Sequence, residues 1–342
     1  MTALRFLGFV LLAQLGVLAS NPHAAARALP KQAATPKSNR GETELLKSIV
    51  LITIEAKEPD KAGKPGKVVT VSGTGFLVGV RDSRLKDLSF TYLVTNRHVA
   101  EAFEQDEKGN CGRLQIQKTY VTLNLKEPIN GNRSDQVDIS NSKQFHWYFP
   151  KDEASDLAVM PFGPPDKYDF RLIDSTMLLS TDVIDKQQVV PGDKVLTGGY
   201  FYHYAGLHEF QPIIREGVLA MMPDGPMPTT TCKSGNVFLV DVHVIRGNSG
   251  SPIFIVPALG LQSAASFGGV PSVFGLLGVV SGYMYESEGL TLRASTTWTG
   301  SANANSGISV VVPAQQLKDL LEGPELQAIR DVDAPQINKI RR

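Results

Sequence analysis

Three short stretches place polar side chains directly beside apolar runs that are typical of buried strands. His98 comes just after the run FTYLV, Asp156 opens the alternating run DLAVM, and Ser249 lies in the polar turn GNSGS ahead of PIFIV. A serine hydroxyl attacks a carbonyl only when a base takes its proton, the base is held in one tautomer, and donors receive the oxyanion. A histidine, a carboxylate and a serine are the residue types for that chemistry. Each one alone is equally typical of a surface or turn residue.

The elements that would position these residues are mostly strands. Short apolar or alternating runs extend over residues 42–312, are rich in Val, Ile, Thr, Phe and Tyr, and are bounded by Gly, Pro, Asp and Asn; this pattern predicts strands. Helical spacing is clear in VPAQQLKDLLE, where one face carries Ala314, Leu317, Leu320 and Leu321. We therefore expect an all-β barrel or sandwich architecture that ends in one C-terminal helix.

The N-terminal residues have the composition of a cleavable secretory signal. One early cation, Arg5, precedes an apolar run from Phe6 to Leu18 and then the alanine-rich HAAARA. This run is shorter than the ~20 residues that span a bilayer, which favours an exported soluble protein over a retained membrane anchor, the alternative. We expect a signal peptide over 1–26, a flexible leader over 27–41, and a periplasmic or secreted location with no membrane association after cleavage.

The charge balance and the histidine spacing exclude several classes of function. The 34 Lys and Arg residues equal the 34 Asp and Glu residues, so no overall field attracts nucleic acid. The remaining candidate ligands, His146, His203, His208 and His243, show no spacing such as H-E-x-x-H. The glycine-rich stretches lack the lysine of a phosphate-binding loop. We expect no metal, no cofactor and no nucleic-acid partner.

The chain has two cysteines, Cys111 and Cys232. Two are too few for a scaffold built on disulfides. An exported protein could join them, but the sequence does not give the distance between their Cα atoms. A disulfide and two free thiols both stay open, as does the oligomeric state.

Taken together, TNRHV, SDLAV and GNSGSP occur in the chain order His, Asp, Ser and resemble the catalytic blocks of chymotrypsin-like serine peptidases. SGTGFLV, PGDKVLTGGYF and REGVLAMM resemble strands of the bacterial trypsin-like peptidases of the HtrA type. The likeness covers about residues 44–321. It implies a peptidase domain over 42–321 with two six-stranded antiparallel β-barrels, the first over about 42–162 and the second over about 183–321, and the site in the cleft between them.

The resemblance also implies a role for each matched residue. His98 is the general base and later the general acid, Asp156 holds its imidazole, and Ser249 is the nucleophile. The backbone N–H groups of Gly247 and Ser249 form the oxyanion hole, since a residue without Cβ lets the chain turn its N–H into the site. The implied activity is that of a serine endopeptidase, which cleaves a peptide or protein substrate through an acyl-enzyme.

Two residues of the third block depart from the pattern of the family. Digestive trypsins have an aspartate at the place of Asn248, and it pairs with the new N-terminal ammonium after proteolytic activation. An uncharged amide cannot make that ion pair, so we expect activity without cleavage of a propeptide. Ser251 stands where glycine is usual, which is a small change in size.

His243, Ser281 and Tyr283 are the candidate residues of the primary substrate pocket. By position, His243 matches the base of that pocket and the segment VVSGY, 279–283, matches one wall. The base has no acidic residue to attract Arg or Lys, and the Tyr283 ring would narrow the pocket. We expect a preference for small or medium uncharged side chains. The alternatives are that His243 binds an acidic side chain of the substrate or is hydrogen-bonded within the barrel as a structural residue.

The C-terminal residues and the serine motif bear on other architectures and functions. Peptidases of the HtrA type carry PDZ domains, but only residues 322–342 follow the expected helix, so we expect a polar tail and no PDZ domain. A catalytically silent binding protein on the same fold is one alternative function. An esterase with the same triad is another, although GNSGS lacks the last glycine of G-x-S-x-G and is not followed by a helix.

Overall fold

The computed structural model of the protein describes residues 41–60, 65–85, 88–105, 111–140, 145–229, 231–256, 265–267, 270–273, 275–293 and 297–340. The expected signal peptide and nearly all of the expected leader lie outside these residues. Within the described ranges, no helix combines the length and the apolar character needed to span a bilayer.

The first half of the chain forms a seven-stranded sheet with the order β7-β6-β1-β2-β3-β8, in which β9 pairs with β2. Its pairs are antiparallel except for β2 with β9. The strands are β1 (Ile49–Lys57), β2 (Val68–Arg81), β3 (Ser89–Thr95), β6 (Gln115–Ile129), β7 (Asn132–Asp138), β8 (Ala158–Pro161) and β9 (Ile173–Asp174).

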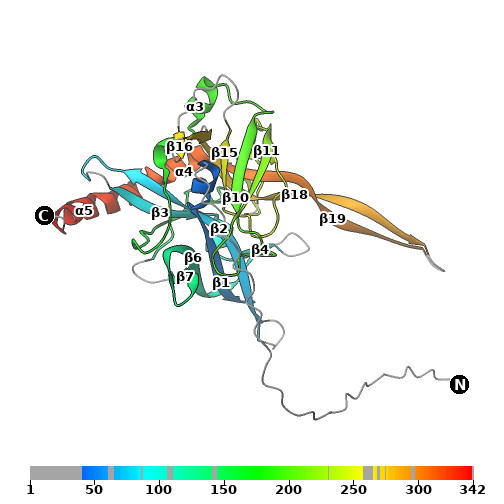
Figure 1. Ribbon diagram of the computed structural model, residues 1–342. Coiled ribbons are helices and arrows are strands. Elements are labelled where there is room, and N and C mark those ends of the chain that lie inside the picture. The colour runs from blue at the N-terminus through cyan, green and yellow to red at the C-terminus, as the bar shows by residue number, and fades with distance from the viewer. Residues whose placement is uncertain are drawn as a thin grey trace, which may run out of the picture. The chain divides into compact units, whose positions relative to one another are not determined.

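The second half forms a closed antiparallel barrel with the order β10-β11-β14-β19-β18-β15. Beyond the barrel, β18 and β19 continue as a paired ribbon that ends at Arg293 and Thr297 (Figure 1). The barrel strands are β10 (Lys194–Gly199), β11 (Ile213–Met221), β14 (Phe238–Asp241), β15 (Pro252–Ile255), β18 (Gly275–Arg293) and β19 (Thr297–Pro313). Short pairs are formed by β4 (Phe103–Gln105) with β5 (Cys111–Arg113), β12 (Met227–Pro228) with β13 (Ser234–Gly235), and β16 (Ala265–Phe267) with β17 (Val270–Val273).

The expectation of a mostly β fold is confirmed, and it includes one closed six-stranded barrel. Among the described residues, the strands of the first half form a sheet whose end strands, β7 and β8, are not paired with each other, so the expected first barrel stays a prediction. At the outer edge of β8, Val159 exchanges backbone hydrogen bonds of 2.7 and 2.9 Å with Tyr148, which forms an isolated bridge. Tyr148 therefore pairs with the edge of β8 that faces away from β3.

Alternation along β1 divides its apolar residues between two clusters, because successive side chains of a strand face opposite sides. Ile52 and Ile54 belong to the cluster inside the sheet, which also contains Leu93. Ile49 and Leu51 belong to a second cluster with the aromatic ring of Tyr200. Strand β1 is therefore buried on both faces, as the continuous apolar run IVLI requires.

A larger cluster joins the sheet to the barrel. It contains Phe76 and Tyr92 from the sheet, Phe254 and Val279 from the barrel, and Leu317 from the C-terminal region. Each of these side chains is at most 1% exposed. Burial on this scale holds the strand ends of the two halves at fixed positions.

The helices are short except at the C-terminus. They are α1 (Gly41–Leu46), α2 (Arg97–Ala100), α3 (Thr181–Lys186), α4 (Ala314–Leu321) and α5 (Pro324–Ile340), and a 3₁₀ turn spans Ser175–Met177. Helix α4 occupies the segment whose spacing predicts the C-terminal helix.

The segment expected to be a polar tail, 322–342, instead contains helix α5. Its buried face carries Leu326, Arg330 and Ala334 at i, i+4 and i+8. Because Arg330 is charged, these positions do not form a continuous apolar pattern in the sequence. Arg330 Nη1 donates to the hydroxyl of Tyr92 at 2.8 Å. Burial raises the pKa of Tyr92, and the hydrogen bond from Arg330 opposes that shift. Helix α5 is thus anchored to β3.

Arg330→Ala tests this anchor. We expect it to lower the free energy of unfolding by about 2 to 3 kcal/mol, because it leaves a buried hydroxyl without its partner and opens a cavity. Urea denaturation of the full chain measures the change. Val332→Ala, at a position 61% exposed on the same helix, is the control and should stay within about 0.5 kcal/mol. Equal effects of the two substitutions would contradict the anchor.

Candidate active site

His98 lies in the one-turn helix α2, directly after the end of β3. The residue that precedes this helix, Asn96, is fully buried and extended, and its side chain does not cap the helix. Instead, Asn96 Nδ2 donates to the carbonyl of Asp156 at 2.8 Å. The start of the helix is therefore tied to the segment that carries the carboxylate.

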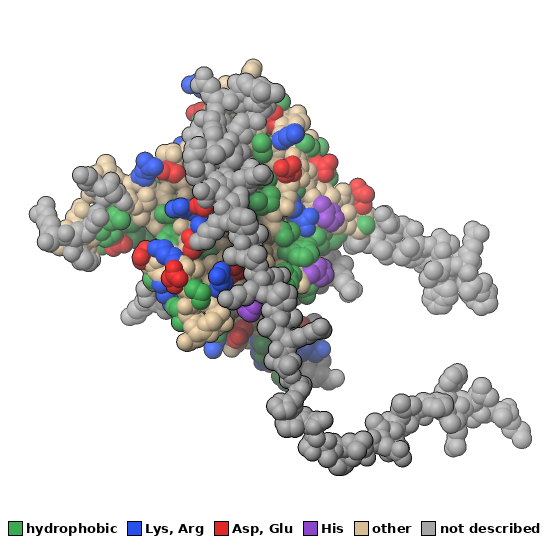
Figure 2. Space-filling model, in the orientation of Figure 1, with side chains coloured by type: hydrophobic (Ala, Val, Ile, Leu, Met, Phe, Trp, Pro, Cys, Tyr) green, Lys and Arg blue, Asp and Glu red, His purple; other side chains and the backbone are tan. Residues whose placement is uncertain are grey.

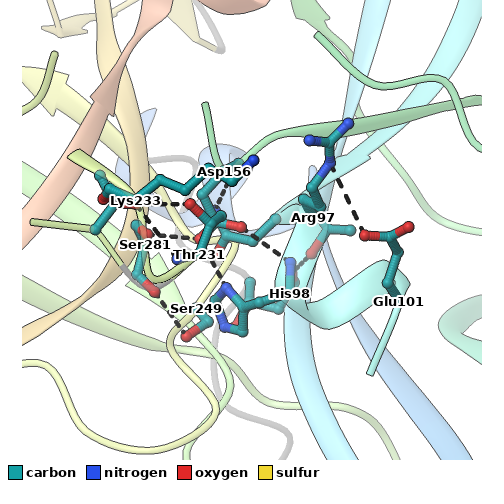
Figure 3. A network of polar contacts seen from close by, with 12 residues as sticks. Arg97, His98, Glu101, Asp156, Thr231, Lys233, Ser249 and Ser281 are labelled. Atoms are coloured by element: carbon teal, nitrogen blue, oxygen red, sulfur yellow. Dashed lines mark hydrogen bonds and ion pairs between the residues drawn. The ribbon is translucent and has the colours of Figure 1, made fainter. Parts of the chain in front are cut away.

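The carboxylate of Asp156 is fully buried, and His98 and Ser281 are among its hydrogen-bond partners (Figure 3). Oδ1 accepts from the backbone N–H of His98 at 2.9 Å, and Oδ2 contacts His98 Nδ1 at 2.7 Å. Oδ2 also accepts from Ser281 Oγ at 2.6 Å. An ionised carboxylate only accepts, so beside it a neutral imidazole takes the tautomer with its proton on Nδ1 and its lone pair on Nε2. This orientation is the one that a general base requires.

Ser249 lies beside the imidazole of His98 in Figure 3, and its hydroxyl donates to the carbonyl of Ser281 at 3.2 Å. Among the described residues, no hydrogen bond joins Ser249 Oγ to the ring of His98. Such bonds are often long before a substrate binds, and rotation of the Ser249 side chain redirects the hydroxyl. Ser281 connects the two halves of the site, since its side chain contacts Asp156 and its carbonyl contacts Ser249.

The turn around Ser249 requires glycine on both sides. Gly247 and Gly250 have φ values of +90° and +88°, in the region that L residues with a side chain rarely adopt. A Cβ at Gly247 would lie 2.6 Å from Tyr200 Cδ1, and one at Gly250 would lie 2.0 Å from the carbonyl oxygen of Thr74. Close packing therefore selects glycine at both positions.

Two backbone N–H groups of this turn have no acceptor. Among the described residues, the N–H groups of Gly247 and Ser249 donate to no protein atom. Their neighbours are engaged, because Asn248 N donates to the carbonyl of Ile245 and Gly250 N donates to strand β18. Buried backbone donors are normally paired, so this pair can receive a negatively charged oxygen.

Asn248 uses both atoms of its side-chain amide within the protein. It is 3% exposed, its Oδ1 accepts from the backbone of Ile245 at 2.9 Å, and its Nδ2 donates to the carbonyl of Tyr200 at 2.8 Å. The uncharged amide of Asn248, at the position where digestive trypsins have an aspartate, therefore holds the turn through local hydrogen bonds.

Thr74 on β2 is a site residue that the sequence analysis does not single out, although it lies in the quoted stretch SGTGFLV. Its N–H donates to the carbonyl of Ser249 at 2.8 Å, and its hydroxyl donates to the carbonyl of Gly247 at 2.7 Å. The same oxygen accepts from Tyr200 N at 2.9 Å, and the carbonyl of Thr74 accepts from Thr95 Oγ1 at 2.7 Å. A buried threonine between glycines is the signal that could have identified it.

The three residues expected in the substrate pocket occupy different environments. His243 is exposed, Ser281 is fully buried against Asp156, and Tyr283 is partly buried. Ser309 on β19 is the backbone partner of Tyr283, and its hydroxyl donates to the carbonyl of Val242, the residue before His243. Strand β19 therefore lies between Tyr283 and His243. Burial and the hydrogen bond from Tyr285 raise the pKa of Tyr283 to about 12.

The environments of Cys232 and Ser251 bear on two expectations from the sequence. Cys232 is disulfide-bonded, and the chain has one other cysteine, Cys111. Ser251 is 1% exposed, and its Oγ has no hydrogen-bond partner among the described residues. The hydroxymethyl group of Ser251 is therefore accommodated in the core.

Charged side chains of both signs are interspersed on the face of the protein drawn in Figure 2. Several form ion pairs, such as Arg84 with Asp331 at 2.8 Å and Lys47 with Asp169 at 3.1 Å. Mixed charge of this kind accords with the balanced composition. Among the described residues, no cluster of three or more His, Cys, Asp or Glu side chains could hold a metal ion.

No protein-family model and no curated protein matches this sequence. The chain is similar in structure to serine protease domains of the HtrA, trypsin-like type. With Deg5 it shares 18% identity at a TM-score of 0.39, over 70% of this chain and 82% of Deg5. With the MamO protease domain from Magnetospirillum magneticum it shares 14% identity at a TM-score of 0.41, over 82% of this chain and 98% of the MamO domain. With the HtrA-type protease AlgW in a tripeptide complex it shares 12% identity at a TM-score of 0.42, over 82% of this chain and 62% of AlgW.

Asn248→Asp tests the hydrogen bonds that hold the turn. The carboxylate would face the carbonyl of Tyr200 without a proton to donate and without a counter-charge, so we expect a loss of about 2 to 4 kcal/mol in the free energy of unfolding. Chemical denaturation at pH 7 measures it. Asn130→Asp, the same exchange in an exposed turn, should cost under about 1 kcal/mol. An unchanged stability of Asn248→Asp would contradict the assignment.

Proposed function

We propose that the chain is an exported serine endopeptidase that cleaves peptide bonds through an acyl-enzyme at Ser249. The observation that carries this proposal is the double contact of Asp156 with the backbone and the ring of His98, at 2.9 and 2.7 Å. It orients the imidazole with Nε2 available as a base. The two unpaired N–H groups beside Ser249 supply the remaining requirement, a site for the oxyanion.

In the proposed reaction, His98 Nε2 takes the proton of the Ser249 hydroxyl as its oxygen attacks the carbonyl carbon of the substrate. The N–H groups of Gly247 and Ser249 donate to the oxyanion, and Asp156 stabilises the imidazolium. The C–N bond then breaks as His98 gives its proton to the leaving amine. Water, deprotonated by His98, hydrolyses the acyl-enzyme and restores the serine.

Ser281 acts as a positioning residue in this proposal. Its hydroxyl fixes one oxygen of Asp156, and its carbonyl holds the Ser249 hydroxyl before a substrate arrives. Displacement of that weak 3.2 Å contact by the substrate frees the hydroxyl for His98. The network within the site thereby keeps the nucleophile near its base without fixing it.

The uncleaved chain is expected to be active. Asn248 satisfies its amide with the backbone of Ile245 and Tyr200, so the turn needs no ammonium from a newly formed N-terminus. The proposal of export rests on the composition of residues 1–26.

Labelling by a fluorophosphonate probe tests the nucleophile. The full-length chain with its leader should react at Ser249, and Ser249→Ala should lose labelling and about 10⁴-fold or more of its kcat for a peptide substrate. Ser251→Ala, which removes a buried hydroxyl two residues away, is the matched control and should keep both. A catalytically silent binding protein would bind peptides equally well with either substitution, and reaction only after trimming would contradict activity of the uncleaved chain.

Cleavage of a diverse peptide library tests the substrate pocket. We expect cleavage after small or medium uncharged side chains, because a neutral Tyr283 narrows the proposed pocket and no carboxylate counters a basic side chain. Tyr283→Gly should improve cleavage after large apolar side chains by about tenfold. Tyr285→Gly, at a more exposed position two residues further along β18, should not. Efficient cleavage after Arg would refute the preference, and cleavage after Glu that His243→Ala abolishes would support the alternative role of His243.

A further inference from the structure

A cavity of about 370 Å³ is formed around the loop 149–155, which immediately precedes Asp156. The other walls come from Asn236, ahead of β14, and from the junction of α4 and α5. Gln316 Nε2 donates to the carbonyl of Asn236 at 2.8 Å and ties two of these walls together. The volume falls within the range of about 300 to 1,000 Å³ that is typical of small-molecule sites.

The body of the cavity is apolar. Phe149 and Pro150 contribute from the loop, and Leu320, Pro324 and Leu326 contribute from the two helices. A side chain or an organic molecule that enters would bury apolar surface, which is worth about 25 cal/mol per Å². The occupant must therefore have an apolar part.

The charged groups around the cavity are mainly acidic. Asp152, Asp319 and Glu325 line it, against the single cation Lys151. Asp319 also accepts from Gln315 Nε2 at 2.6 Å, which fixes its carboxylate at the end of α4. The C-terminal end of a helix favours cations as well. An occupant that complements these groups carries a positive charge.

Ser155 adds an unused hydrogen-bonding group to the wall. The residue lines the cavity and is 5% exposed, while its Oγ is itself buried and has no hydrogen-bond partner among the described residues. Buried hydroxyls are normally paired, and each exception calls for an explanation. A donor on a bound molecule would supply the missing partner once rotation of the Ser155 side chain turns its hydroxyl toward the cavity.

We propose that this cavity is a ligand site for an apolar group that carries a protonated amine or guanidinium. The apolar part packs on Phe149 and Leu320, and the cation lies among the carboxylates and donates toward Ser155. The group can come from a free organic amine or from the Lys or Arg side chain of a peptide.

The loop connects this site to the segments that carry Asp156 and His98. Ser155 is bonded to Asp156 in the chain, and Arg97 Nη2 donates to the carbonyl of Pro150 at 3.3 Å. The guanidinium of Arg97 lies 4.7 Å from the ring centre of Phe149 and is next to His98 in the chain. An occupant that shifts this loop therefore shifts the segments that hold the acid and the base. This consequence for turnover rests on the proposed function.

Binding is tested on the full chain with Ser249→Ala, so that it does not depend on activity. Methyl NMR of the leucines follows titration with phenethylamine at pH 7, with its neutral analogue 2-phenylethanol, and with N-acetyl-lysine methylamide. We expect saturable shifts of Leu320 and Leu326 with phenethylamine and affinity at least about fivefold weaker for the alcohol. Response to the lysine derivative as well would identify a peptide side chain as a source. Equal binding of amine and alcohol, or no saturable shift, would overturn the proposal.

Variants locate the site. Asp319→Asn with Glu325→Gln should weaken phenethylamine about fivefold, and Ser155→Ala should weaken it about threefold. Glu322→Gln, an exposed position between the same helices that does not line the cavity, should not change the affinity. Without ligand, Ser155→Ala should unfold at the same or a higher denaturant concentration, because the lost hydroxyl has no partner. A loss of stability would show that Ser155 is structural and would count against the site.

Turnover of the active chain tests the link to the triad. Saturating phenethylamine should change kcat for a peptide, and Asp319→Asn with Glu325→Gln should remove that change at the same concentration. An unchanged kcat together with retained binding would overturn the link. Absence of peptidase activity in every variant would instead refute the proposed function, while the NMR titration still decides the ligand site.

Discussion

A carboxylate can be buried only when donors surround it, because the loss of its hydration is costly. Asp156 meets this condition with donors from two parts of the fold, the backbone and ring of His98 after β3 and the hydroxyl of Ser281 on β18. Asn96 holds the carbonyl of the same residue. The arrangement exists only when the sheet and the barrel are packed together, so the site is a product of their shared core.

The turn around Ser249 depends on the same packing from the other side. Its carbonyls are held by Thr74 of the first sheet, although the turn belongs to the barrel. The positive φ angles of Gly247 and Gly250 let the backbone lie within contact of Tyr200 and Thr74. Among the described residues, the carbonyls of Gly247 and Ser249 are thus engaged with β2 while the N–H groups of the same two residues have no protein acceptor.

The C-terminal helices extend this dependence to the far end of the chain. Leu317 of α4 belongs to the core shared by the sheet and the barrel, and Arg330 of α5 reaches Tyr92 on β3. Strand β3 ends at the residues that lead to His98. The cavity at the junction of these helices adjoins the loop before Asp156, so the last helices, that loop and the site form one continuous set of contacts.

The sequence by itself determined the mostly β character, because alternating runs of β-branched and aromatic residues act locally, and it identified His98, Asp156 and Ser249 as candidates through their motifs. Only the tertiary structure decided which segment pairs with the free edge of β8, since Tyr148 does so through backbone hydrogen bonds that leave no trace in composition. It likewise decided the role of Ser281 toward Asp156 and of Thr74 toward the turn, because those contacts join residues more than a hundred positions apart. The apolar pattern did not predict helix α5 because its buried face contains Arg330, whose guanidinium is satisfied by hydrogen bonds to the hydroxyl of Tyr92 and the side chain of Gln327.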